Sequence, residues 1–272
     1  MTAITQQMFE RVVPAFRDAE PRIFEAIQPM VLKWQYVCHN DLGIEPQDET
    51  TEQMLTQYVC LAAACDAVPQ MDLAATENGF AVVSNQNYAP ASRDRVAALR
   101  EELRGQRSDA RDRLMLRLVA LNPDTPPRFC APLRATLMGC PMLARRYGVS
   151  MTEGRTVYEE EHRALLPRIY EAQHAAARIV SDEQMAWLVA HQDEYAALHP
   201  DDRCNVLRER VCRFMAAHIM QLKQTPALAR ALQAFLNDNA DALPEYRDSQ
   251  KFLSDTFKPY QNERNDSTFF FG

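Results

Sequence analysis

The sequence predicts a mainly α-helical fold, a multi-helix bundle with one small β-hairpin and an extended C-terminal tail. Three observations lead to this prediction. Apolar residues recur at helical spacing along most of the chain, an Asn-Gly pair stands between two short β-prone runs, and the last polar stretch ends in three phenylalanines. The chain has 272 residues, enough for one large domain or two small ones with a buried core.

The first helices are expected before residue 70. Pro21 suits the first turn of a helix, and the apolar residues after it recur at helical spacing: Ile23, Phe24, Ile27, Met30, Val31 and Trp34. Residues 39–50 have the composition of a polar loop. A second helix is expected over about residues 51–67, with one side buried through Met54, Leu55, Tyr58, Val59 and Ala62.

Residues 71–88 differ in composition from the helical segments before them and predict a small β-hairpin. Asn78-Gly79 lies between two short runs of apolar and β-prone residues. Both central positions of a type I′ turn need positive φ, which makes Asn-Gly the strongest short-range hairpin signal. We expect Phe80, Val82 and Val83 in the second strand.

The clearest helix is expected over residues 93–121. Ser92 is a good N-cap because its hydroxyl can accept a hydrogen bond from the free N–H groups of the first turn. On a helical wheel the apolar residues Val96, Leu99, Leu103 and Leu114 cluster on one face. Gly105 is expected to weaken or bend the helix near its middle.

This helix carries three separated strips: an apolar, a basic and an acidic one. The basic strip spans about 60° and extends for about 27 Å, and consists of Arg93, Arg100, Arg104, Arg107 and Arg111. The acidic strip consists of Asp94, Glu101, Asp109 and Asp112. Three interpretations stay open. The arginines of one copy face the acids of another, they contact the backbone of packaged or translocating DNA, or they extend beside the core of an ordinary amphipathic helix.

The rest of the chain is expected to form an irregular segment, a second helical region and a tail. Residues 122–155 contain NPDTPP, several lone glycines and few periodic signals, as in a linker or insertion. Helices resume near Thr156, and Ser181 is expected to cap one of them. The expected parts are a helical region with the hairpin at 1–121, the linker at 122–155, a helical region at 156–258 and an arm at 259–272.

The arm ends in Phe269, Phe270 and Phe271, after about ten polar residues. Three consecutive aromatic side chains are costly to leave in water, and burial of each contributes roughly 1.5–3 kcal/mol. The polar spacer favours an arm that inserts into a neighbouring molecule. A tail that folds back on its own core is the alternative.

Composition excludes several function classes. A net charge of −7 argues against a general nucleic-acid binder. With seven glycines and neither GxGxxG nor GK[ST], the chain has no phosphate-binding loop, and no cofactor is expected. Seven cysteines without a CxxC pair indicate buried apolar side chains in a reducing compartment. No apolar run is long enough to cross a membrane, and no signal peptide is expected.

Two Glu-x-x-His pairs, Glu159…His162 and Glu171…His174, have the spacing of helical di-iron ligands. Both pairs are expected on one helix, twelve residues apart, which separates them by about 18 Å along the axis and about 120° around it. One metal cluster cannot use both, so we expect an exposed polar face. No residue is assigned to catalysis, to a cofactor or to a metal, and the chain is expected not to be an enzyme.

Two parts of the sequence carry a resemblance. Residues 76–85 (TENGFAVVSN), followed by Ala89-Pro90-Ala91-Ser92 and an Arg-rich helix, and the Phe-Phe-Phe ending resemble an uncharacterised family of structural proteins from phages and prophages of Bacteroidetes. The resemblance implies a virion protein, a head–tail connector or neck adaptor that forms a homo-oligomeric ring. Its implied partners are copies of itself, portal and tail proteins and, in passing, packaged DNA; its implied location is the virion, and the host cytoplasm during assembly.

Two other functions stay open: a helical metal-dependent enzyme that uses the Glu-x-x-His pairs, and an assembly chaperone that acts as a monomer or dimer. The docking surfaces expected for an assembly protein lie on the hairpin, the arginine strip and the arm. The candidate interface residues are Asn78, Gly79, Phe80, Val82, Arg93, Arg100, Arg104, Arg107, Arg111, Phe269, Phe270 and Phe271.

Overall fold

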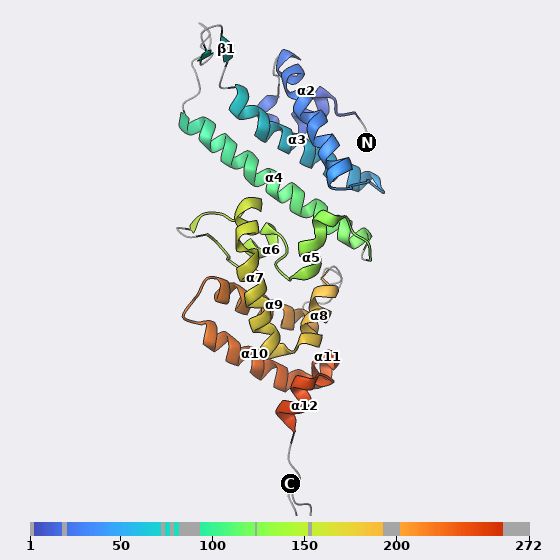
Figure 1. The fold of residues 1–272 in the computed structure, drawn as a ribbon, viewed down its shortest axis with the longest axis vertical. Helices are drawn as coiled ribbons and strands as arrows, with labels where there is room; N and C mark the ends of the chain where they lie inside the picture. Colours follow the sequence, from blue (N-terminus) through green and yellow to red (C-terminus); the bar gives the residue numbers. More distant parts are fainter. Residues whose placement is uncertain are drawn as a thin grey trace, which may run out of the picture. The chain divides into compact units, whose positions relative to one another are not determined.

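The chain is mainly helical, as the sequence predicts (Figure 1), and divides into two compact units, residues 1–170 and 171–272. The fold is taken from a computed structural model. The structure describes residues 3–17, 21–71, 74–76, 79–81, 93–122, 124–151, 154–192 and 202–257. No helix within these ranges is both long and apolar enough to span a membrane.

The first unit opens with short helices that lead into α3. Thr5 caps α1 by accepting a hydrogen bond from the Met8 N–H. The expected loop after residue 39 begins later than predicted, because the chain first continues as a π-helical turn in which the Leu42 N–H donates to the Val37 carbonyl. The elements are α1 (Gln6–Val12), η1 (Pro14–Phe16), α2 (Pro21–Tyr36), η2 (Val37–Asp41) and α3 (Glu49–Met71).

The core of this unit lies where α2, α3 and α4 (Arg93–Leu121) pack together (Figure 1). Small residues on α3, among them Ala63, Ala64 and Ala67, let the neighbouring helices approach closely. On α4, Leu103 and Leu114 are buried, as the helical wheel predicts, while Val96 and Leu99 are partly buried against the same core. The bounds of α4 confirm the predicted helix over residues 93–121.

Two short strands lie between α3 and α4. β1 (Ala74–Thr76) pairs antiparallel with β2 (Gly79–Ala81), and Thr76 stands opposite Gly79. Asn78 and Val82 lie outside the described residues, as do Glu77 and residues 83–92, whereas Gly79, which was expected in the turn, belongs to β2. The type I′ turn and the hairpin in its full predicted extent therefore stay predictions.

The segment after α4 packs into the first unit, so the chain divides at a different place from the expected linker at 122–155. Its elements are too short to show a helical period: η3 (Arg128–Cys130), α5 (Ala131–Ala135) and α6 (Pro141–Arg146). The segment nevertheless buries apolar side chains, among them Leu133, Met138 and Leu143. The division falls inside α7 (Glu159–Val180), between Tyr170 and Glu171.

The second unit contains the end of α7 and the helices that follow it. Ser181 caps α8, as predicted, by accepting a hydrogen bond from the Gln184 N–H at 3.1 Å. Asp202 caps α9 in the same way, and α9 packs against α10. The elements are α8 (Asp182–Ala190), α9 (Arg203–Ile219), α10 (Thr225–Asn239), η6 (Ala240–Ala242), α11 (Pro244–Arg247) and α12 (Gln250–Thr256).

The predicted arm at 259–272 lies outside the described residues, so Phe269, Phe270 and Phe271 stay candidates from sequence alone. The end of α12, the helix before it, exposes two large apolar side chains. Leu253 and Phe257 are 53% and 73% exposed, and their spacing of four residues places them on one side of the chain as it leaves α12.

Candidate functional site

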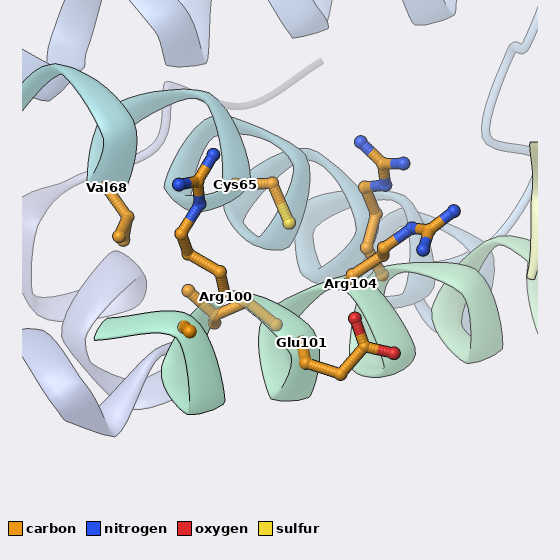
Figure 2. Close-up of a pocket in the computed structure, with 8 residues that line it drawn as sticks. Cys65, Val68, Arg100, Glu101 and Arg104 are labelled. Carbon is orange, nitrogen blue, oxygen red and sulfur yellow. The ribbon is translucent and has the colours of Figure 1, made fainter. Parts of the chain in front are cut away.

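An open pocket of about 370 Å³ lies between the second half of α3 and the first half of α4 (Figure 2). We call it the arginine pocket. Its lining consists of Cys65 and Val68 from α3 and of Ala97, Arg100, Glu101, Leu103, Arg104 and Arg107 from α4. Three of the five arginines of the predicted strip therefore line one cavity.

The helical repeat explains why these arginines come together. Arg104 and Arg107 follow Arg100 by four and seven residues, so all three lie on one face of α4. In Figure 2, the Arg100 side chain extends from α4 toward Cys65 and Val68 of α3. Val68 and Leu103 are buried and form an apolar floor, and the small Ala97 leaves the space beside them open.

Arg104 is held in place by the start of α7. Its Nη2 donates to both carboxylate oxygens of Glu161, at 2.8 and 3.0 Å, and lies 3.3 Å from Glu160 Oε2. Its guanidinium also lies over the Tyr158 ring, 5.0 Å from the centroid. Although partial burial opposes ionisation of Glu161, the hydrogen bond from Arg104 and its charge hold the pKa of that carboxyl below its ordinary value.

Arg100 and Arg107 have no such partner. In the part of the chain that the structure describes, no carboxylate forms an ion pair with either guanidinium. The pocket therefore contains, next to an apolar floor, two guanidiniums without an ion-pair partner among the described residues, together with the single carboxylate of Glu101. An anionic group that also carries an apolar side chain would complement both features.

The two remaining strip arginines differ from each other. Arg111 is directed into its own unit, where its side chain is only 15% exposed. It lies near Asp112 and Glu159, at 3.6 and 3.5 Å, and over the Phe129 ring. Arg93 is the first residue of α4, and its side chain lies outside what the structure describes, as do those of Gly79 and Phe80. Arg104 and Arg111 thus support the chain's own fold.

Three of the four residues of the acidic strip interact within the chain, while Asp94 is exposed, which weighs against the interpretation that the strip pairs with another copy. Asp109 forms an ion pair with Arg145, and Glu101 accepts a hydrogen bond from Tyr158. Asp112 is completely buried, and its Oδ2 accepts a hydrogen bond from the Met142 N–H at 2.8 Å. Burial raises the pKa of Asp112 to about 7. Asp109 and Asp112 face the segment after α4, which the wheel of a single helix cannot show.

The Glu-x-x-His pairs both lie on α7, as predicted, but His162 is not on an exposed face. It is 5% exposed, and its Nε2 lies 2.8 Å from the Met138 carbonyl. Burial lowers the pKa of His162. Its partner Glu159 forms ion pairs with Arg111 and Arg163. Across the described ranges, no group of three or more His, Cys, Asp or Glu side chains is placed to hold a metal ion.

The comparisons with known proteins point to the same part of the chain. The profile of DUF6712, a family of unknown function, matches residues 35–125. This stretch contains α3 and α4, and so every residue that lines the arginine pocket. No curated protein and no solved structure matches the chain. Over these residues the chain is similar to a family to which no activity is attached.

Proposed function

We propose that this chain is a non-enzymatic assembly protein, the adaptor of a phage head–tail junction, which forms a homo-oligomeric ring between portal and tail. The observation that carries the assembly role is the arginine pocket, in which Arg100 and Arg107 have no ion-pair partner among the described residues and lie beside an apolar floor. Arginine is enriched at protein interfaces because its flat, weakly hydrated group combines charge with apolar contact.

The pocket offers binding chemistry and little reaction chemistry. Its one thiol, Cys65, has a pKa raised above the ordinary value by burial, so it is not an activated nucleophile. Its one carboxylate, Glu101, accepts a hydrogen bond from Tyr158. These features favour docking over catalysis.

The placement in a phage particle rests on the resemblance carried by residues 76–92 and by the Phe269–Phe271 ending. Residues 76–92 lie within the stretch that matches the family of unknown function. The net charge of −7 suits a ring around passing DNA, because a conduit must not bind its cargo tightly. Portal and tail proteins are then the partners, with the virion as the location.

Self-association tests this proposal. We expect native mass spectrometry and cryo-electron microscopy to show a closed homo-oligomeric ring, alone or after addition of the portal protein from the same particle. Deletion of residues 262–272 should impair ring formation and leave the helical circular dichroism signal and Tm unchanged. A chain that stays monomeric or dimeric under both conditions would favour the assembly chaperone instead.

Metal analysis tests the enzyme alternative. Because the imidazole of His162 contacts the Met138 carbonyl and Glu159 is paired with arginines, we expect purified protein to hold iron, manganese and zinc well below one ion per chain. His162→Gln and His174→Gln should then show the same metal content as the unmodified chain. One tightly held ion per chain, lost in the His162 variant alone, would contradict a non-enzymatic role.

A further inference from the structure

We infer that the arginine pocket binds residues 263–271 of a second copy of the chain, with Glu263 and Asp266 at Arg107 and Arg100 and an aromatic ring against the apolar floor. The inference rests on the proposed homo-oligomeric function and names the contact between copies. We call residues 263–271 the docking segment; its sequence is Glu-Arg-Asn-Asp-Ser-Thr-Phe-Phe-Phe.

Spacing supports the match between charges. Arg100 and Arg107 are seven residues apart on α4, which separates them by about 10 Å along the helix axis. Glu263 and Asp266 are three residues apart, which is one full turn of an extended polyproline II helix, so both side chains then lie on the same side of the segment, about 9 Å apart. One extended segment can therefore place one carboxylate at each unpaired guanidinium, where a charge-assisted hydrogen bond can form.

The apolar part of the pocket supports the aromatic contact. Val68 and Leu103 are 6% and 2% exposed, and together with Ala97 they form a surface without a charged group. The volume of about 370 Å³ is near the lower end of the range for ligand sites, roughly 300–1,000 Å³. It suits a short peptide segment with one inserted ring, and it is too small for a folded domain.

An acidic peptide fits the site better than nucleic acid does. Glu101 lines the pocket and would repel a phosphate backbone, while a peptide can direct its carboxylates away from it. A phosphate backbone also makes no use of the apolar floor. The docking segment lies further along the chain than α12, where Leu253 and Phe257 are already exposed.

Charge reversal in the full chain tests the contact. The pocket variant is Arg100→Glu/Arg107→Glu, and the segment variant is Glu263→Arg/Asp266→Arg. Each alone should weaken self-association at least about tenfold in sedimentation equilibrium, because like charges then face each other. A 1:1 mixture should restore association, since each variant supplies the partner that the other needs. Restoration also requires the contact to join two chains.

Two further variants separate this contact from general charge effects. Arg22→Glu/Arg113→Glu makes the same change in net charge at exposed arginines outside the pocket, and it should associate like the unmodified chain. Ala97→Leu changes no charge but fills the pocket from an exposed position, and it should weaken association as the pocket variant does.

A labelled peptide of residues 259–272 keeps the test independent of ring formation. Fluorescence anisotropy should show it binding the unmodified chain at least about tenfold more tightly than the pocket variant. Equal binding, or a ring whose stability none of the variants changes, overturns the inference and leaves the proposed function standing. Nucleic acid that copurifies with the unmodified chain and is lost in the pocket variant also overturns it. Peptide binding without any ring overturns the proposed function instead.

Discussion

Gly139→Ala is expected to lower the free energy of unfolding of the first unit by at least about 3 kcal/mol. A Cβ at this position would lie 2.3 Å from the Pro132 carbonyl oxygen and 2.5 Å from the Leu133 Cα. Both atoms belong to the backbone of α5, so no side-chain rotation relieves the overlap. Urea unfolding followed by circular dichroism measures the loss as a lower midpoint.

Gly105→Ala is the matched control for this prediction. Its added Cβ would lie 3.3 Å from the Tyr158 hydroxyl, which is the far end of a side chain that can shift. Alanine is also the better helix former by about 1 kcal/mol, which offsets the crowding. We expect a net change within about 1 kcal/mol. A similar loss in both variants would mean that the close approach at Gly139 does not limit stability.

Asp112→Asn is expected to stabilise the first unit at pH 8 by about 1–3 kcal/mol. The Asp112 carboxyl is completely buried, and burial raises its pKa from 3.8 to about 7. A carboxyl with a raised pKa binds its proton more tightly in the folded chain. The folded chain therefore loses stability as the pH rises from about 4 to about 7. Asparagine keeps an acceptor for the Met142 N–H and removes the buried charge.

The amide nitrogen of that asparagine would lie near the guanidinium of Arg111. The expected gain in the free energy of unfolding is therefore smaller than the pKa shift of Asp112 alone would give. Urea unfolding of both proteins at pH 6 and pH 8 measures the effect, and the difference between them should grow with pH. Asp109→Asn serves as the control, because it breaks the ion pair with Arg145 and should not stabilise. An Asp112→Asn chain that is less stable at pH 8 would show that the charge is needed for packing.

The sequence predicts an element best where the element is long and has its own capping residue and apolar periodicity. The helix over residues 93–121 has a serine before it and an apolar face, and it forms with the predicted bounds. The segment at 122–155 contains helices of three to six residues, in which no period can appear. Their burial depends on contacts with α4, so only the three-dimensional fold shows that they belong to the first unit.

The candidate site follows the same pattern. Arg100, Arg104 and Arg107 are close in sequence, so their spacing alone predicts that they share one face of α4. The lining of the pocket confirms this prediction. Whether an arginine is free depends on Glu160 and Glu161, more than fifty residues away along the chain, so no helical wheel can separate Arg104 from Arg107. Cys65 and Val68 were missed because nothing in the sequence links them to the strip.

His162 shows a signal that could have been found. It lies three residues before Leu165 and seven before Ile169, both buried, and so continues the apolar side of α7. The Glu-x-x-His motif indicates a metal ligand from the spacing between Glu159 and His162. The apolar periodicity of α7 instead predicts that the imidazole lies in the core. A buried histidine that contacts a carbonyl is the result.

The seven cysteines give the chain a selective chemical reactivity. Burial raises the pKa of Cys38, Cys60, Cys130 and Cys140 to about 12, so almost none of these thiols is ionised near neutral pH. Of the seven, only Cys65 and Cys204 are more than slightly accessible. Cys65 lines the arginine pocket, and Cys204 lies in the other unit. Burial raises the pKa of Cys65 and that of Cys204, the latter to about 11, so labelling by a maleimide dye should be slow and favoured by mildly alkaline pH. Each unit thus contains one thiol that a dye can reach, and a dye on Cys65 sits where an arriving segment would displace or shield it.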